Sequence, residues 1–224
     1  MEISIFSLVV FGIGVIVLPL IFMKLVTPDM LKKQPAYVFV AAIFFVLIGF
    51  LAAFFVFSVA LSMAMLAFSS LLLLPFIVHI LEPEEKIEIQ GEMMGLHQFG
   101  SILKKHEKLI TFYIFLFFGM AIEYMFLFSF LPPNITETAF KAQLDVFGPA
   151  GHFSLPYANI LMNNLQVLFI AFALSVFYGA GSIFVLSYNA SILGVMYGTP
   201  LKLSLIHISE PTRPLYISYA VFCL

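Results

Sequence analysis

The chain alternates long apolar runs with short polar segments. A helix of about 20 apolar residues crosses the roughly 30 Å hydrocarbon core of a bilayer. By that length the pattern predicts spans at Ser4–Phe22, Tyr37–Val56, Ala60–Leu81, Leu109–Leu131, Ala158–Tyr178 and Ser182–Gly198. The sequence therefore predicts an all-α, polytopic transmembrane helical bundle of five or six spans.

The first run has three interpretations. Met23 opens MKLVTPDMLKKQPAY, which would itself make a sensible cytoplasmic start. Residues 1–22 are then a genuine span, an uncleaved signal-like segment, or upstream translation. The run lacks the Lys/Arg region that precedes the apolar part of a signal peptide.

The last residues match translated sequencing-library adapter DNA. LSLIHISEPTR at residues 203–213 and ISYAVFCL at 217–224 are both adapter peptides in one frame, separated by the length of an index. We therefore interpret residues 203–224 as an artefact and residues 23–202 as a truncated membrane domain. The only cysteine, Cys223, and the only arginine, Arg213, fall in that tail. Thiol chemistry and disulfides are thus not expected in the rest.

Composition supports the membrane class. The chain is 62% hydrophobic and 10% charged, with 28 Phe and no Trp, whereas soluble domains average about 25% charged residues. No basic stripe suggests a nucleic-acid partner. The spans also hold no Ser/His pair, HExxH motif or paired aspartates, so we expect no enzyme, and we expect no metal or other cofactor.

Lysine placement predicts the topology. Residues 24–36 and 82–108 hold seven of the nine lysines, whereas residues 132–157 hold only Lys141. The positive-inside rule then makes the first two segments cytoplasmic and the third external, in a multi-pass protein of the cell membrane.

Two of these segments also carry helix signals of their own. Residues 92–108 have the spacing of an amphipathic interfacial helix. Asn134 with Glu137 has the form of a capping box that starts a helix in the external segment.

The last two spans hold most of the polar groups. Asn163 and Asn164 lie near the start of the first of these spans, and Asn189 lies in the second. Gly179 and Gly181 lie where the chain passes from one span to the other. The second span also carries a stripe of small residues at helical spacing: Ser187, Ser191, Gly194 and Gly198. Such stripes let helices approach closely. The alternative is a polar cavity in which the asparagines bind a substrate.

Glu123 is the one ionisable side chain well inside a predicted span. A carboxylate at that depth costs about 2.5–3.5 kcal/mol, so it should face protein or water. One interpretation is a proton or cation site. The other is a protonated glutamic acid hydrogen-bonded to an amide such as Asn163 or Asn189.

The chain resembles the stage II sporulation protein M family, in particular its archaeal members. The resemblance rests on the NN pair, the apolar run, the glycine pair and the later asparagine in residues 159–198, and it extends to KKHEKLITFYIFLFFGM, FLPP, AFKAQLD and MKLVTPDMLKKQPAY. Ala190 departs from the glycine that many members have after the asparagine. The resemblance implies a membrane scaffold that gathers partner proteins, and no catalytic residues.

Two functions therefore stay open. The first is a non-enzymatic membrane scaffold or complex subunit. Its expected partners are the lipid bilayer, membrane or envelope proteins, and other copies of itself in a homo-oligomer. The second is a transporter or permease component with a path lined by Asn163, Asn164, Asn189 and Glu123.

Overall fold

Every regular element of the described chain is a helix. The computed structural model describes residues 5–27, 30, 34–57, 60–93, 107–147, 157–178 and 181–209. The helices are α1 (Ile5–Leu25), α3 (Ala36–Val56), α4 (Leu61–Met93), α6 (Glu107–Phe130), α7 (Pro133–Ala139), α8 (Lys141–Phe147), α9 (Tyr157–Tyr178) and α10 (Gly181–Ser209). The predicted all-α class is confirmed for these residues.

Four helices are long and apolar enough to cross a membrane. They comprise α3, α6 and the segments Leu61–Leu81 of α4 and Gly181–Leu205 of α10. This indicates a membrane protein. Within the described residues, the first and fifth predicted spans hold only shorter apolar segments, Gly12–Leu25 and Asn164–Ser175. The expected count of five or six spans is therefore not confirmed.

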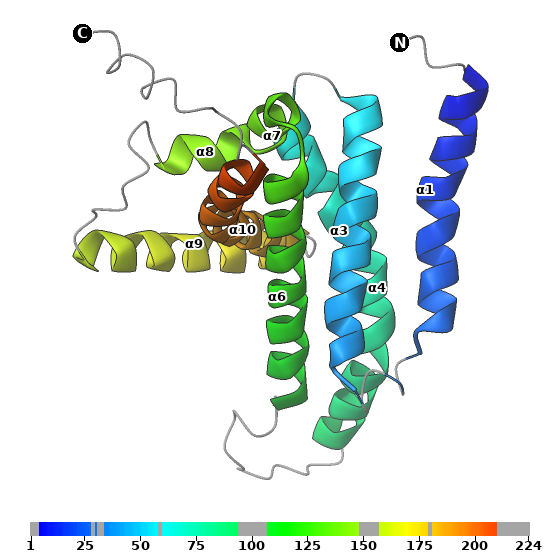
Figure 1. Cartoon of the computed structure of the whole chain (residues 1–224). Coiled ribbons are helices and arrows are strands. Elements are labelled where there is room, and N and C mark those ends of the chain that lie inside the picture. The colour runs from blue at the N-terminus through cyan, green and yellow to red at the C-terminus, as the bar shows by residue number, and fades with distance from the viewer. Residues whose placement is uncertain are drawn as a thin grey trace, which may run out of the picture.

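The four long helices form one bundle. Helix α3 packs against both α4 and α6, and α10 packs most extensively against α6 and also against α4. Helix α1 stands beside α3 and α4, while α9 lies across the direction of α6 and packs on α10 (Figure 1). The helices thus differ in orientation, with α9 crosswise to the bundle.

The chain alternates in direction through the first part of the bundle. The end of α1, the start of α3, the end of α4 and the start of α6 all lie at one end, and α7 and α8 lie at the other (Figure 1). The segments that carry most lysines are thus attached to one end of the bundle.

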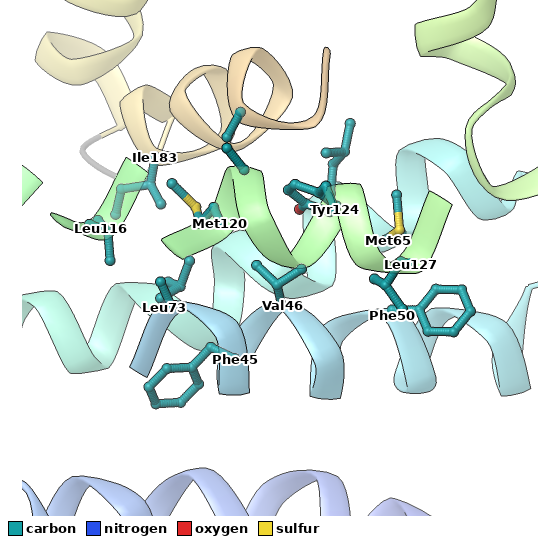
Figure 2. Close-up of a cluster of buried hydrophobic side chains, with 14 of the residues drawn as sticks. Phe45, Val46, Phe50, Met65, Leu73, Leu116, Met120, Tyr124, Leu127 and Ile183 are labelled. Atoms are coloured by element: carbon teal, nitrogen blue, oxygen red, sulfur yellow. The ribbon is translucent and has the colours of Figure 1, made fainter. Parts of the chain in front are cut away.

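Aromatic and aliphatic side chains fill the interior (Figure 2). Phe45, Leu116, Met120 and Tyr124 are fully buried there. Between helices in lipid, the hydrophobic effect contributes little because lipid tails are as apolar as leucine, so close van der Waals packing must hold the helices together.

Helix α1 joins the bundle through aromatic contacts. The ring of Phe22 stacks on that of Phe44, with centroids 4.7 Å apart and an interplanar angle of 12°. It meets Phe45 edge-on at 5.6 Å. Such pairs contribute about 0.5–1.5 kcal/mol beyond their buried area, so the end of α1 is held at α3.

Glycine permits the closest helix crossing of α6 with α3. A methyl group at Gly119 would lie 2.6 Å from the carbonyl oxygen of Phe39 and 2.7 Å from Cβ of Ala42. Real side chains do not reach such distances, so a residue larger than glycine would push α3 away from α6.

The segment after the α6 span folds differently from the predicted capping box. The helix that follows begins after Pro132, with Pro133 in its first turn, and no side-chain cap bond forms there. Proline suits this position because its missing N–H is one of those a helix start leaves unpaired. Asn134 therefore lies inside α7, which ends at Phe140 before α8 begins.

The predicted amphipathic helix at 92–108 falls mostly on residues 94–106, outside the described chain. The acidic residues of segment 82–92, just before it, are part of α4, which continues as one helix to Met93.

Candidate functional site: buried polar contacts beneath α7 and α8

The stripe of small residues on α10 faces α6. Ser187, Ser191, Gly194 and Gly198 are all buried. A methyl group at Gly194 would lie 2.7 Å from Cβ of Tyr124 and 2.8 Å from the backbone nitrogen of Met125. The backbones of α10 and α6 are thus in close contact at this glycine.

Helices α6 and α10 run in the same direction along this contact. Ser187 of α10 contacts Tyr124, whereas Gly198, further along α10, accepts a hydrogen bond from Ser129 at 3.3 Å. Residue numbers thus increase in the same direction along both helices. The chain between α6 and α10 therefore returns to the starting level of α10 through α7, α8 and α9.

A tyrosine pairs with the stripe in the centre of the bundle. The Tyr124 hydroxyl lies 2.7 Å from Ser187 Oγ, within hydrogen-bond distance, and both residues are fully buried. Ser69 of α4 lies near the same phenol, yet its own hydroxyl has no hydrogen-bond partner of good geometry. A methyl group at Gly49 of α3 would meet the backbone of Ser69. All four long helices therefore meet around these polar groups.

Gln143 of α8 joins three helices. Its Oε1 accepts a hydrogen bond from Ser62 Oγ of α4 at 3.0 Å, and its Nε2 donates to Ser191 Oγ of α10 at 2.8 Å. Ser62 Oγ also accepts from the backbone N–H of Ala142 at 3.3 Å, and Ser191 Oγ donates to the carbonyl of Tyr188 at 2.7 Å. Gln143 is fully buried, so α8 inserts a polar side chain into the bundle and satisfies it there.

Lys202 of α10 caps the end of α6. Its ammonium group donates to the carbonyl oxygens of Phe128 and Leu131 at 3.0 Å each, and to Thr136 Oγ1 at 2.6 Å. It also lies 5.3 Å from the centroid of the Phe128 ring. The last carbonyls of a helix have no partners within the helix and carry partial negative charge. A lysine at this place therefore neutralises the end of α6 and ties α7 to α10.

The two predicted asparagines whose side chains are described, Asn164 and Asn189, do not pair with each other. Asn189 donates through Nδ2 to the carbonyl oxygen of Val185 at 2.8 Å, so its amide bonds to its own helix. Asn164 is exposed on α9. The side chain of Asn163 lies outside the described part of the chain, as does Gly179.

Gly181 begins α10 close to α9. A methyl group there would lie 2.7 Å from Cβ of Leu174. Helices α9 and α10 are therefore in close contact where the chain passes from one to the other.

Glu123 is buried, with 8% of its surface exposed. It therefore faces protein, as the cost of a carboxylate in hydrocarbon requires. It does not pair with Asn189, whose amide nitrogen bonds within α10.

The described residues hold no cluster of metal-ligating side chains, and one groove among them is apolar. No group of three or more His, Cys, Asp or Glu side chains gathers among them. A groove of about 400 Å³ runs beside the first half of α6, and its lining is apolar: Leu109, Ile110, Tyr113, Ile114, Phe117, Phe118 and Leu186. None of the four residues of the proposed transport path lines it.

Four contributors to these contacts were not among the candidate residues of the sequence analysis: Tyr124, Thr136, Gln143 and Lys202. Each pairs with a residue more than 60 positions away. Only Lys202 had a local hint, since a lysine that follows an apolar span often lies at a membrane boundary.

Comparison with protein-family models, with curated proteins and with solved structures finds no match.

Proposed function

We propose that the protein is a non-enzymatic integral membrane scaffold or complex subunit of the stage II sporulation protein M type, which assembles envelope-associated partners. The observation that carries the proposal is the mutual pairing of the buried polar groups. Gln143 is satisfied by Ser62 and Ser191, and Tyr124 by Ser187. Such contacts fix helices to one another.

The closeness of the helices supports the same function. At Gly119 and Gly194 the backbones of neighbouring helices are too close for a methyl group. Close packing of this kind holds neighbouring helices together by van der Waals contact. A tightly packed bundle with lipid-facing helices suits a subunit that positions other proteins.

The orientation follows from the lysines. We place residues 24–36 and 82–108 on the cytoplasmic side of the cell membrane, and residues 132–157 on the external side. Helices α7 and α8 would then face the envelope. Their exposed residues, including Lys141 and Asp145, are the surface that we assign to an external partner.

The test is purification of the tagged full chain from its native membranes after chemical cross-linking, followed by identification of the bound proteins. We expect one or a few envelope proteins in fixed ratio. The variant Lys141→Glu with Asp145→Lys should lose them while the bundle stays folded, since both side chains are exposed. The matched control exchanges exposed residues elsewhere, for example Met196→Leu.

A transport function would give a different result. Purified protein in vesicles would then carry a solute or protons, and Glu123→Gln or Asn189→Leu would abolish the flux. Flux of this kind, together with no partner in fixed ratio, would overturn the scaffold proposal.

A further inference from the structure

Glu123 is a buried acid in the membrane part of α6. It lies sixteen residues after Glu107 and seven before Phe130, the first and last residues of the helix. At 1.5 Å per residue these separations are about 24 Å and about 10 Å. The side chain is 8% exposed, and no hydrogen bond or ion pair joins its carboxyl group to another residue of the described chain.

Glu123 lies on the face of α6 that packs against α3. It follows Gly119 by four residues, and side chains four apart lie above one another on a helix. A methyl group at Gly119 would lie 2.6 Å from the carbonyl oxygen of Phe39. One turn before Glu123, the backbones of α3 and α6 are therefore too close for a layer of water between them.

The four spans bring no positive charge into contact with Glu123. Their other ionisable side chains are Tyr37, His79, Glu107, Lys108, Tyr113, Tyr124, Tyr188, Tyr197 and Lys202. The tyrosines are neutral at neutral pH, since a phenol ionises at about pH 10. Lys108 lies in the first turn of α6, and His79 is the third-last residue of the α4 span, near the same end of the bundle (Figure 1). Lys202 is bonded to carbonyl oxygens at the end of α6 and to Thr136.

A carboxylate at this place would therefore have no counter-ion. An acid in such surroundings keeps its proton, because the charged form loses its water and gains no partner. Water could hydrate the charged form fully only if α3 and α6 moved apart.

We propose that Glu123 is an intramembrane proton-binding site, which holds a neutral carboxylic acid at the contact of α6 with α3 and loosens that contact when the proton leaves. The inference goes beyond the proposed function. It does not depend on that function, because a proton that stays in place needs no path across the bundle.

Proton binding at Glu123 links the stability of the bundle to pH. A glutamic acid in water loses its proton at about pH 4.3. Above that pH, the folded protein binds one proton more than the unfolded chain, so the free energy of unfolding falls as the pH rises. The sign is opposite to that of a carboxylate held in an ion pair, which loses stability as the pH falls.

A lipophilic carbodiimide tests the protonation state of Glu123. The O–H of a carboxylic acid adds across one C=N bond of the reagent, with the proton on nitrogen and the carboxyl oxygen on carbon. The O-acylisourea then rearranges to an N-acylurea, so the side chain gains the mass of the whole reagent and nothing leaves.

The full chain in vesicles is treated with this reagent, and its peptides are weighed by mass spectrometry. We expect a label on Glu123 that decreases as the pH rises from about 5 to about 9, a range in which carboxyl groups in water are ionised. Glu137 is the internal control because it is exposed on α7, and it should stay unlabelled.

Thermal unfolding of the full chain in detergent tests the link to stability. The midpoint temperature should fall with rising pH, by on the order of 3 °C per pH unit for one proton. Glu123→Gln keeps the shape of the side chain without its charge, so it should remove this dependence. Glu137→Gln is the matched control and should keep it.

Three results would each overturn the proposal. They are no label on Glu123 at the acid end of the range, a label that does not change with pH, and a Glu123→Gln protein with the pH dependence of the unchanged chain. If Glu123→Gln does not fold, the labelling of the unchanged chain decides alone.

Discussion

The ammonium group of Lys202 lies 2.6 Å from the hydroxyl of Thr136. This contact joins α10 to the short helix α7. Thr136 Oγ1 itself lies 3.0 Å from the carbonyl oxygen of Leu131 and 3.1 Å from that of Pro132. Lysine and threonine together therefore satisfy backbone groups that the end of α6 and the turn into α7 leave open.

Replacement of Lys202 by methionine should destabilise this end of the bundle. Methionine keeps the apolar stem and removes three hydrogen bonds from a charged donor. Because the side chain is partly exposed, we expect a loss of about 1 kcal/mol in the free energy of unfolding, below the usual range for charged hydrogen bonds. Unfolding in mixed detergent micelles measures it. Lys141→Met, at an exposed site of α8, should change the free energy by less than about 0.5 kcal/mol; equal losses would contradict the cap.

Gln143→Leu should loosen α8. Leucine of similar size leaves the hydroxyl of Ser62 without its acceptor, and a buried unsatisfied group costs about 1–3 kcal/mol. Proteolysis within α7 and α8 should become faster, because α8 loses its contacts with α4 and α10. The control is Asp145→Asn on the exposed face of the same helix, which should leave the rate unchanged.

A double-mutant cycle isolates the hydrogen bond of Gln143. Ser62→Ala and Gln143→Leu should be less destabilising together than the sum of the single losses, with a coupling of about 0.5–1.5 kcal/mol. Additive losses would mean that the two side chains do not depend on each other.

Gly194→Ala should destabilise the bundle, although alanine is the better helix former by about 1 kcal/mol. The added methyl group would meet Tyr124 and the backbone of Met125, and overpacking costs about 1–3 kcal/mol. Gly12→Ala is the control because nothing lies within 4 Å of its added methyl group. The two substitutions should therefore differ in sign, with Gly12→Ala neutral or stabilising in the same unfolding assay.

Ser69→Ala should be neutral or stabilising by up to about 1 kcal/mol. The hydroxyl of Ser69 is buried without a hydrogen-bond partner of good geometry, so its removal ends a desolvation cost. Ser70→Ala is the matched control on the same helix, since Ser70 Oγ donates to Leu66 O at 2.7 Å and its loss should not stabilise. A loss of stability above 1 kcal/mol for Ser69→Ala would show that the hydroxyl is paired.

Helix positions were predictable where an apolar run decides them. The run expected at residues 37–56 is α3 at Ala36–Val56, and the run expected at 109–131 is α6 at Glu107–Phe130. Length and hydropathy suffice there, because a helix is the simplest way to satisfy every backbone group in lipid.

The fifth run shows the limit of that argument. Residues 157–178 are helical as expected, but α9 lies crosswise on α10 (Figure 1). Hydropathy predicts that a segment prefers lipid and does not give its direction, which depends on the contacts of its neighbours. The parallel direction of α6 and α10 is likewise a property of long-range packing.

The small-residue stripe could be found because it repeats at helical spacing on one helix. The contacts of Gln143 could not, because Ser62 and Ser191 lie on two other helices, 81 and 48 residues away. A glutamine in a polar segment usually faces water. Only the docking of α8 against both helices makes this one a buried link.

The two hydrogen bonds of Gln143 also have a consequence for the order in which the protein is made. A ribosome completes α4 and α8 before it makes α10, so Oε1 can find Ser62 while Nε2 still lacks Ser191. The contacts of α8 are thus completed only when α10, the last of the three helices to be made, is in place. A chain halted before α10 would keep α8 only half attached, with Nε2 of Gln143 lacking its acceptor on Ser191.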